Sequence, residues 1–316
     1  LFAGSSCCNI NTYIDAKNVC NMIGIPHFTY DCKGEFKKYV IDDFINCYKN
    51  CKTPNPCIEC NKYMKFGAMY EKAKELGCDY IATGHYAKME YSDEYGKYVL
   101  RKAKNLSKDQ SYVLYNMPKQ LLGKVLFPLG DFKSKEDVRK IAKEHNLSVA
   151  SKPDSEDICF IPDGNYKKFL EQNSSIVPKE GNIVNRKGEI LGRHTGLYNY
   201  TIGQRKGLGI SYKAPLFVIG FNKERNEVIV GEQQELYRKE MKVNEVNLLL
   251  MDKIERTLDV TVKIRYASKP AEAIINQTES GNIQVIFKEP QRGITPGQSA
   301  VFYIGDVVVG GGKIQD

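Results

Sequence analysis

The sequence predicts an α/β domain followed by all-β modules. Helix and strand signals alternate over residues 1–162, which is the pattern of a parallel sheet covered by helices. After residue 163 the helical periodicity fades, and short strands separated by Gly and Asn turns take its place. Residues 261–266 alternate strictly, with Val262, Ile264 and Tyr266 expected on one face of a strand.

Local signals define the expected elements of the first domain. Asn11 or Thr12 caps the first helix, two prolines make 53–56 a loop, and Ser134 with Asp137 begins a later helix with a capping box. The expected elements are, in order, a helix over 13–23, a strand over 28–30, a helix over 36–47, the loop over 53–56, a helix over 61–76, a strand over 80–83 and a helix over 134–145.

We expect three domains, over residues 1–162, 163–229 and 230–316. Ligands of a parallel sheet bind at the carboxyl ends of its strands, and Gly84 and His85 follow the strand expected over 80–83. The second domain is a Gly-rich β module. The third has the short alternating strands of a small antiparallel barrel.

The cysteine distribution indicates a reduced, cytoplasmic protein. Nine of the ten cysteines lie between Cys7 and Cys78, and only Cys159 lies beyond them. A secreted protein held by disulfides distributes them through the fold, whereas a cytosolic protein keeps its thiols reduced. No run reaches the roughly 18 apolar residues of a membrane helix, so we expect no membrane partner.

The positive charge is concentrated in one part of the sequence. The net charge is +8, and residues 101–150 hold eleven Lys or Arg against five Asp or Glu. A local basic excess is typical of a surface that faces a polyanion. A solvated, Lys-rich helix face would give the same pattern.

The most informative local motif is TPNPCIECN at 53–61. It places Cys57 and Cys60 where a rigid loop enters a helix, and the positive end of the helix dipole favours a reactive thiolate there. Cys-x-x-Cys spacing by itself is compatible with metal binding, redox chemistry or nucleophilic sulfur. Because Cys47 and Cys51 lie close upstream, a four-thiolate zinc site is an alternative interpretation.

Two other motifs are less specific. Cys159 stands between two large apolar residues, a setting in which a lone cysteine is usually a small buried hydrophobe. The run over 203–209 has the glycines of a phosphate-binding loop, but no helix pattern follows, so no dinucleotide site is expected. Its Arg205 and Lys206 suit contact with an RNA backbone or a solvated turn.

Taken together, ordered motifs along nearly the whole chain resemble the MnmA-type tRNA-uridine 2-sulfurtransferases (2-thiouridylases). The matching stretches are TPNPCIECN at 53–61, KF at 65–66, DYIATGHYA at 79–87, SKDQSYVLY at 107–115, FPLGD at 127–131, DSEDICFI at 154–161, TIGQRKGLGI at 201–210, VKIRY at 262–266 and EPQRGITPGQSAVFY at 289–303. The resemblance implies a pyrophosphate-loop ATPase-like α/β domain, a central tRNA-binding module and a C-terminal antiparallel β-barrel.

The resemblance also implies roles for individual residues. Cys60 matches the family's nucleophile, and Cys159 matches the thiol that carries a persulfide and forms a disulfide with Cys60. The remaining matches are Asn55, Pro56 and Cys57 in the loop that meets the target base, Gly84 at the nucleotide, and His85, Lys108, Asp109, Gln110, Arg265, Tyr266 and Gln298 at the tRNA.

The implied reaction is ATP-dependent 2-thiolation of the wobble uridine in tRNAs that read Lys, Glu and Gln codons, with Mg²⁺. The C2 carbonyl is a poor electrophile, so ATP activates its oxygen by adenylation. A persulfide on Cys159 then supplies sulfur, or hydrosulfide is released when Cys60 resolves the persulfide as a disulfide. The implied partners are tRNA, whose target base leaves the stack, and a cysteine desulfurase or sulfur-relay protein.

Two features depart from the family pattern. The family's Ser-Gly-Gly-x-Asp-Ser pyrophosphate loop lies upstream of the region matching Gly4 to Cys8 and is absent, so we expect a truncated chain that is inactive alone. A tRNA-binding but catalytically inactive fragment is the alternative. Many members carry Asp where Cys57 stands, and the three thiols Cys57, Cys60 and Cys159 provide an alternative, iron-sulfur-dependent route.

A different enzyme class is the remaining alternative. A pyrophosphate-loop ATPase acting on a small substrate would share the α/β domain. Such an enzyme would not account for the barrel, nor for the motifs around Lys108, Arg265 and Gln298.

Overall fold

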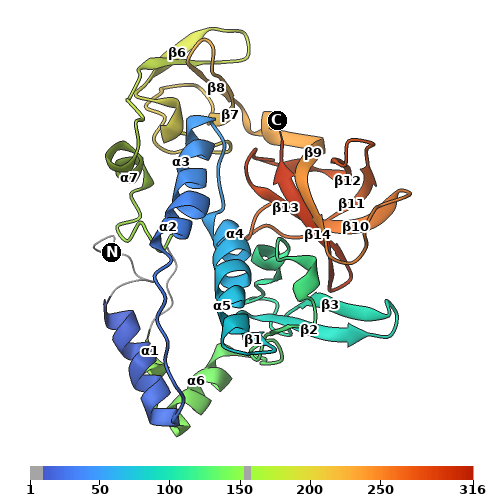
Figure 1. The fold of residues 1–316 in the computed structure, drawn as a ribbon. Coiled ribbons are helices and arrows are strands. Elements are labelled where there is room, and N and C mark those ends of the chain that lie inside the picture. The colour runs from blue at the N-terminus through green and yellow to red at the C-terminus, as the bar shows by residue number, and fades with distance from the viewer. Residues whose placement is uncertain (1–9, 153–157, 316) are drawn as a thin grey trace.

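The computed structural model describes residues 10–152 and 158–315. An α/β part, a four-stranded central sheet and a barrel follow one another along the chain, and Figure 1 shows the barrel beside the helices of the first part. The predicted α/β-then-all-β class is confirmed. The region from Gly4 to Cys8, where the expected truncation begins, lies outside the described residues.

Two long helical segments dominate the first part. After α1 (Ile10–Ile23), one segment runs through α2 (Lys33–Phe36), a π-helical stretch (Lys37–Ile41) and α3 (Asp42–Lys49). The other runs through α4 (Pro56–Glu59), a π-helical stretch (Cys60–Ala68) and α5 (Met69–Glu75). The second segment thus begins five residues before the predicted start at 61.

The prediction of a strand over 28–30 is wrong. Phe28 and Tyr30 lie in extended chain with 57% and 44% of their surface exposed. A strand needs a neighbour to hydrogen-bond its backbone, and no strand of the described residues pairs with this segment. Extended apolar sequence was therefore not sufficient for a strand here.

The strand expected over 80–83 is confirmed as β1 (Ile81–Ala82), which pairs in parallel with β4 (Val125–Leu126). Between them lie the hairpin β2 (Ala87–Ser92) and β3 (Lys97–Lys102) and two 3₁₀ turns (Ser111–Leu114 and Lys119–Leu121). The helix α6 (Lys135–Glu144) starts with the predicted capping box of Ser134 and Asp137, and a 3₁₀ turn (Ser148–Ser151) follows.

The central module holds a helix that the sequence pattern did not reveal. Helix α7 (Tyr166–Asn173) packs Phe169 and Leu170 against the cluster around α3. The sheet that follows has the order β6-β5-β8-β7. Its strands are β5 (Gly181–Val184), β6 (Ile190–His194), β7 (Phe217–Asn222) and β8 (Glu227–Gly231), with a 3₁₀ turn at Leu197–Asn199.

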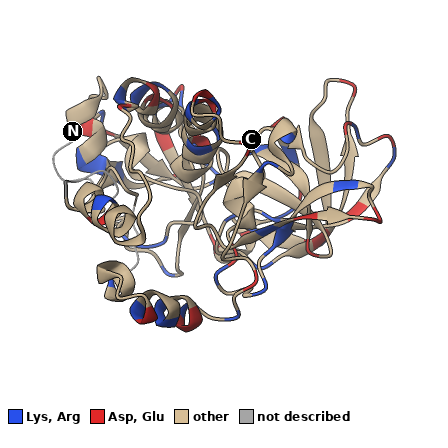
Figure 2. Ribbon diagram, turned by 60° about the horizontal axis from the view of Figure 1, so that its bottom comes forward, with Lys and Arg blue, Asp and Glu red and all other residues tan. Residues whose placement is uncertain are grey.

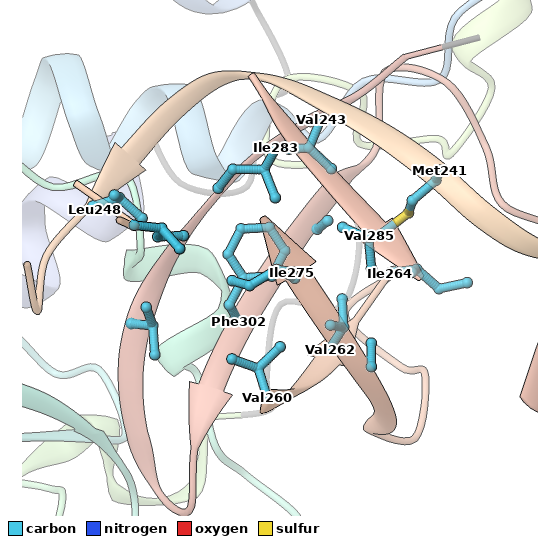
Figure 3. Packing of buried hydrophobic residues seen from close by; sticks show 14 of the residues in the cluster. Met241, Val243, Leu248, Val260, Val262, Ile264, Ile275, Ile283, Val285 and Phe302 are labelled. Carbon is cyan, nitrogen blue, oxygen red and sulfur yellow. The ribbon is translucent and has the colours of Figure 1, made fainter. Parts of the chain in front are cut away.

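The C-terminal part is a closed antiparallel barrel of six strands. Pairing runs β13-β10-β11-β12-β9-β14, and β14 pairs again with β13. Figure 3 shows its interior packed with side chains such as Val262, Ile275 and Phe302. The elements are a 3₁₀ turn (Gln233–Leu236), β9 (Tyr237–Leu248), β10 (Leu258–Lys263), β11 (Ala271–Gln277), β12 (Ile283–Arg292), β13 (Ser299–Ile304) and β14 (Val307–Ile314).

One face assignment in the barrel is wrong. Val262 and Ile264 are buried as predicted, but Tyr266 has 44% of its surface exposed. Strand β10 ends at Lys263, and the Ser268 amide donates to the Arg265 carbonyl in the turn that follows. The two-residue alternation therefore stops before Tyr266 and leaves its ring outside the core.

The first part and the barrel share a sheet and a core. Strand β3 joins the barrel sheet through the pairing of Arg101 with Val307 on β14. Tyr112, Tyr115 and Tyr303 are fully buried in one apolar cluster between the two parts. In the described part of the chain, no helix combines the length and the apolar character that crossing a membrane requires.

The barrel core generates a first prediction. Phe302 has no exposed surface, so Phe302→Ala should lower the free energy of unfolding by about 3–5 kcal/mol through lost burial and a cavity. Urea unfolding followed by circular dichroism measures the change. Ile286→Ala is the control because 39% of that side chain is exposed, and an equal loss in both variants would contradict the assigned interior.

Candidate functional site

The two cysteines of the Cys-x-x-Cys motif lie in the first turns of a helix. Pro56 occupies the first position of α4, where a missing amide proton costs nothing, and Asn55 precedes it as the N-cap. The Ile58 amide donates to the Asn55 carbonyl at 3.1 Å. Cys57 is exposed in the first turn, whereas Cys60 is half-buried one turn further on.

Cys60 and Cys159 pack against the same apolar cluster although 99 positions separate them in the sequence. The cluster combines side chains of the α2–α3 segment and α7 with Phe160, Ile161 and Tyr198. Both thiols are half-buried at its margin. Both predicted thiols therefore lie at the margin of one cluster, while the preceding residues 153–157 lie outside the described part.

The arrangement of donors does not fit either metal alternative. In residues 10–152 and 158–315, no group of three Cys, His, Asp or Glu side chains is placed to hold a metal ion. Cys47 points into the core beside Asp43, and burial followed by the Asp43 charge raises its pKa to about 12. Burial thus opposes the thiolate form that zinc needs, and Cys57 lies exposed outside the cluster that Cys60 and Cys159 share.

Gly84 and His85 follow β1, as predicted, but their surroundings differ. Gly84 is exposed, and a Cβ built on it would meet nothing closer than a Leu129 methyl carbon at 3.8 Å. His85 is buried between Thr83 and Lys65, with ring nitrogens 2.8 Å from the Thr83 Oγ1 and 3.2 Å from the Lys65 Nζ. The open backbone lies at Gly84, and the imidazole faces inward.

The partners of His85 determine its tautomer. An ammonium group can only donate, so the His85 Nε2 accepts from Lys65, and Nδ1 carries the proton and donates to the Thr83 Oγ1. Burial and the Lys65 charge lower the pKa of His85 to about 3. The imidazole is therefore a neutral, oriented group near neutral pH.

The three residues of the Lys108-Asp109-Gln110 motif differ in exposure, from exposed Lys108 through half-buried Gln110 to buried Asp109. The buried Asp109 accepts from the amides of Ala103 and Ser111 at 2.9 and 3.2 Å, which shapes the loop. The Gln110 Oε1 accepts from the amide of Tyr86 at 2.9 Å. The motif therefore combines one exposed cation with two side chains that build its support.

A second group of cations lies where β10 leaves the barrel. The Lys263 Nζ stands 5.7 Å from the ring centre of Tyr112 and 5.6 Å from that of Tyr266. Burial lowers the pKa of Lys263, and nearby Asp109 offsets part of that effect. Burial raises the pKa of Tyr266, and the charges of Asp109 and Cys57 add to that effect.

Arg265 and Gln298, both expected at the tRNA, make contacts within the protein. The Arg265 Nη2 donates to the Arg292 carbonyl at 3.2 Å, while the residue stays exposed. The Gln298 Nε2 donates to the carbonyls of Thr53 at 2.9 Å and Pro54 at 3.2 Å. Gln298 therefore reaches the loop before Cys57 from the barrel.

The sequence did not reveal an ion pair beneath the helical segment that begins at Pro56 and carries Cys57 and Cys60, here called the thiol helix. Lys313 on β14 lies 3.2 Å from a carboxylate oxygen of Glu59, which is buried between the two cysteines of the motif. Asp43 and Glu245 also lie within 3.6 and 3.1 Å of the ammonium. A lone lysine in the apolar run of β14 was the signal in the sequence, but its partners could not be read from it.

The basic excess in 101–150 belongs partly to a solvated helix. Five of the eleven cations lie on or beside α6, which buries no residue, with Glu136, Asp137 and Glu144 interspersed. Figure 2 shows both charges side by side on the helices. The cations near the loop and barrel, such as Lys102 and Lys108, form the remaining candidate polyanion surface.

Three family models match the chain in succession. They are described as a tRNA methyl transferase HUP domain over residues 2–163, a tRNA methyl transferase PRC-barrel domain over 167–232 and an aminomethyltransferase beta-barrel domain over 238–314.

The similar proteins include several tRNA-specific 2-thiouridylases MnmA. The chain is 48% identical over 98% of its length to a tRNA-specific 2-thiouridylase MnmA of Acetivibrio thermocellus, of which 86% is covered. Proteins of the same name from Caldicellulosiruptor saccharolyticus and Clostridioides difficile are 48% and 47% identical over 100% and 98% of the chain. Of these two proteins, 87% and 85% are covered.

The buried imidazole generates a pH prediction. Because the folded pKa of His85 lies below its ordinary value of 6.5, the unfolded chain binds the extra proton first, and stability falls as pH drops below 6.5. Between pH 7.5 and 5, wild type should lose up to about 2 kcal/mol more unfolding free energy than His85→Gln. Urea unfolding at both pH values measures this difference.

His145→Gln is the control because His145 is exposed. It should follow the pH dependence of wild type. Parallel pH dependences for wild type and His85→Gln would contradict a buried, neutral His85.

Proposed function

The chain belongs to the family of tRNA-specific 2-thiouridylases, and on that premise we propose that Cys60 and Cys159 carry sulfur to C2 of a tRNA wobble uridine. The observation that supports this most is the packing of both thiols against one apolar cluster, with Cys60 directly after α4. One thiol comes from each of two segments far apart in the sequence, as a two-thiol exchange requires.

The two thiols have different tasks in this proposal. Cys159 receives a sulfane sulfur and becomes a persulfide. Its terminal sulfur forms a bond to C2 of the adenylated uridine, and the C2–O2 bond breaks so that AMP leaves with the oxygen. The Cys60 thiolate then attacks the Cys159 Sγ and breaks the S–S bond, so the transferred sulfur stays on C2 as the thiocarbonyl. Both cysteines end as a disulfide, and a thiol reductant returns the two electrons before the next cycle.

ATP with Mg²⁺ is the proposed co-substrate, and it supplies activation of the uridine O2 as a leaving group. The part of the chain that suits it is the carboxyl end of β1, where the exposed Gly84 leaves room for close approach. His85 beside it holds its neutral imidazole in one orientation through Thr83 and Lys65.

Half-buried cations and the exposed ring of Tyr266 support tRNA as the substrate. Lys263 lies over the rings of Tyr112 and Tyr266, and Tyr266 is exposed for stacking with an unpaired base. The Lys102 Nζ lies 4.3 Å from the ring centre of Tyr303. Burial lowers the pKa of Lys263, and the charge of Lys102 adds to that effect. Phosphates of an RNA backbone would relieve the repulsion between these two cations.

The finer expectations remain proposals. We propose a cysteine desulfurase or a sulfur-relay protein as the sulfur donor and tRNAs for Lys, Glu and Gln codons as substrates. We also propose that the protein is located in the cytoplasm. The names of the relatives do not favour a catalytically inactive fragment. Among the described residues, no three Cys, His, Asp or Glu side chains are placed to hold a metal, and this does not favour an iron-sulfur route.

Substitution of the thiols tests the proposal. Cys60→Ser and Cys159→Ser should each abolish 2-thiouridine, because each removes one of the two sulfur atoms of the exchange. Mass spectrometry of nucleosides from tRNA of cells that depend on each variant measures the product. Cys57→Ser should retain product, whereas an iron-sulfur route through all three thiols would lose it.

Cys78→Ser is the matched control, since Cys78 is an exposed cysteine just beyond α5. It should leave 2-thiouridine at the wild-type amount. Unchanged 2-thiouridine in both Cys60→Ser and Cys159→Ser would show that these thiols do not carry the sulfur.

The cation beside the exposed ring generates a second, independent test. Lys263→Met should weaken tRNA binding and lower the slope of log K against log salt concentration by about 1, as expected for one lost phosphate contact. Filter binding at several salt concentrations measures the slope. Lys288→Met is the control because its ammonium pairs with Glu272 on the barrel surface, and equal slopes in the two variants would exclude the contact.

A further inference from the structure

One edge of the barrel holds the loop that precedes the thiol helix. The Thr53 amide donates to the Pro296 carbonyl at 2.9 Å, and the Gln298 Nε2 donates to the carbonyls of Thr53 and Pro54. An amide NH₂ group has two protons, and two carbonyls face it. The donors of Gln298 are therefore engaged within the protein before any RNA arrives.

The turn that makes these contacts is itself firmly held. The Gly297 amide donates to the Ile314 carbonyl at 3.0 Å, and the Ile314 amide donates to the Gln298 carbonyl at 2.8 Å. Gly297 has φ +89, and a Cβ there would lie 2.8 Å from the Lys52 Cβ and 2.9 Å from the Thr53 nitrogen. Only glycine permits so close an approach of barrel and loop.

A second contact comes from the residue before Ile314 on β14. Lys313, which precedes Ile314, forms its ion pair with Glu59 inside the thiol helix. Burial opposes the charged form of Lys313, but Glu59, Asp43 and Glu245 outweigh it and raise its pKa. The ammonium is thus retained, and it links α3, α4 and the barrel at one point.

We propose that Gln298 and Lys313 are positioning residues that fix the start of the thiol-bearing helix from the barrel. Gln298 acts on the loop before Cys57, and Lys313 acts on the turn between Cys57 and Cys60 through Glu59. The barrel then belongs to the sulfur-transfer site as well as to the tRNA surface. The catalytic consequence rests on the proposed function, whereas the structural one does not.

The assignment differs from the tRNA contact that the resemblance implies for Gln298. A residue that only contacts tRNA affects binding and leaves the free protein unchanged. A positioning residue changes the loop in the absence of tRNA and lowers turnover with little effect on binding. Amide exchange, tRNA affinity and the separate values of kcat and KM therefore distinguish the two roles.

The experiment compares wild type, Gln298→Ala and Gln291→Ala without tRNA by hydrogen–deuterium exchange of a peptide covering 53–60. Gln291 is the matched control because its Nε2 also donates to a backbone carbonyl, that of Glu289, but away from the loop. Gln298→Ala should exchange about tenfold faster over 53–60, the factor expected for two lost hydrogen bonds. Its kcat should fall about tenfold, with KM and the tRNA Kd within about twofold.

Three outcomes decide the role of Gln298. Unchanged exchange with a weaker tRNA Kd would overturn positioning in favour of direct tRNA contact. Faster exchange with unchanged kcat would overturn its importance for catalysis. If Gln298→Ala exchanges faster but the wild-type protein makes no 2-thiouridine, the exchange result supports positioning. The missing product then counts against the proposed function.

Lys313 is tested from both sides of its ion pair. Glu59→Gln keeps the size of the side chain and removes the charge that Lys313 holds, so it serves even where Lys313→Met does not fold. Either folded variant should exchange faster at 57–60, while Lys288→Met, with its ion pair on the barrel surface, should not. Wild-type exchange in a folded Glu59→Gln variant would overturn the role of Lys313.

Discussion

Three buried tyrosine hydroxyls join the first domain to the barrel. Tyr112 donates to the Ser299 carbonyl at 2.8 Å, Tyr115 lies 3.0 Å from the Ser299 Oγ, and Tyr303 lies 3.3 Å from the Ser111 Oγ. Burial raises the pKa of each phenol above its ordinary range, so all three stay neutral and hydrogen-bonded. These rings fill the core between the two parts, and the polar contacts keep that core in one arrangement.

These contacts between the first domain and the barrel explain why the residues of the candidate site come from the whole chain. The barrel face that meets the tyrosines ends in the turn at 295–298 and in Lys313, and these hold the segment from Thr53 to Glu59. On the other side, the 3₁₀ turn at Ser111–Leu114 receives the Asn61 side chain, whose Nδ2 donates to the Val113 carbonyl at 2.9 Å. The thiol helix is therefore fixed at its start by the barrel and along its length by its own domain.

Particular residues show how far the sequence could be interpreted. The motif around Cys57 and Cys60 was recognisable because proline and paired cysteines have few other uses at a helix start. The strand before Gly84 was also predictable, since a short apolar run bounded by glycine is a local signal. Asp109 and Gln298 were expected at the tRNA, but their polar groups bind the backbone of the protein itself. Which partner a polar side chain finds depends on segments distant in sequence, so local patterns do not contain that information.

The sequence by itself determined the order of α/β domain and β modules, the loop and helix around Cys60, and the family. These follow from local periodicity, turn chemistry and ordered motifs, each of which is complete within a short stretch of chain. The sequence paired Cys159 with Cys60 through the resemblance, and the tertiary structure supplied the cluster against which both pack. Only the tertiary structure decided that His85 is buried and neutral and that Lys313 meets Glu59. Burial and pairing arise when distant segments pack together, and that packing sets the protonation, orientation and accessibility of each group.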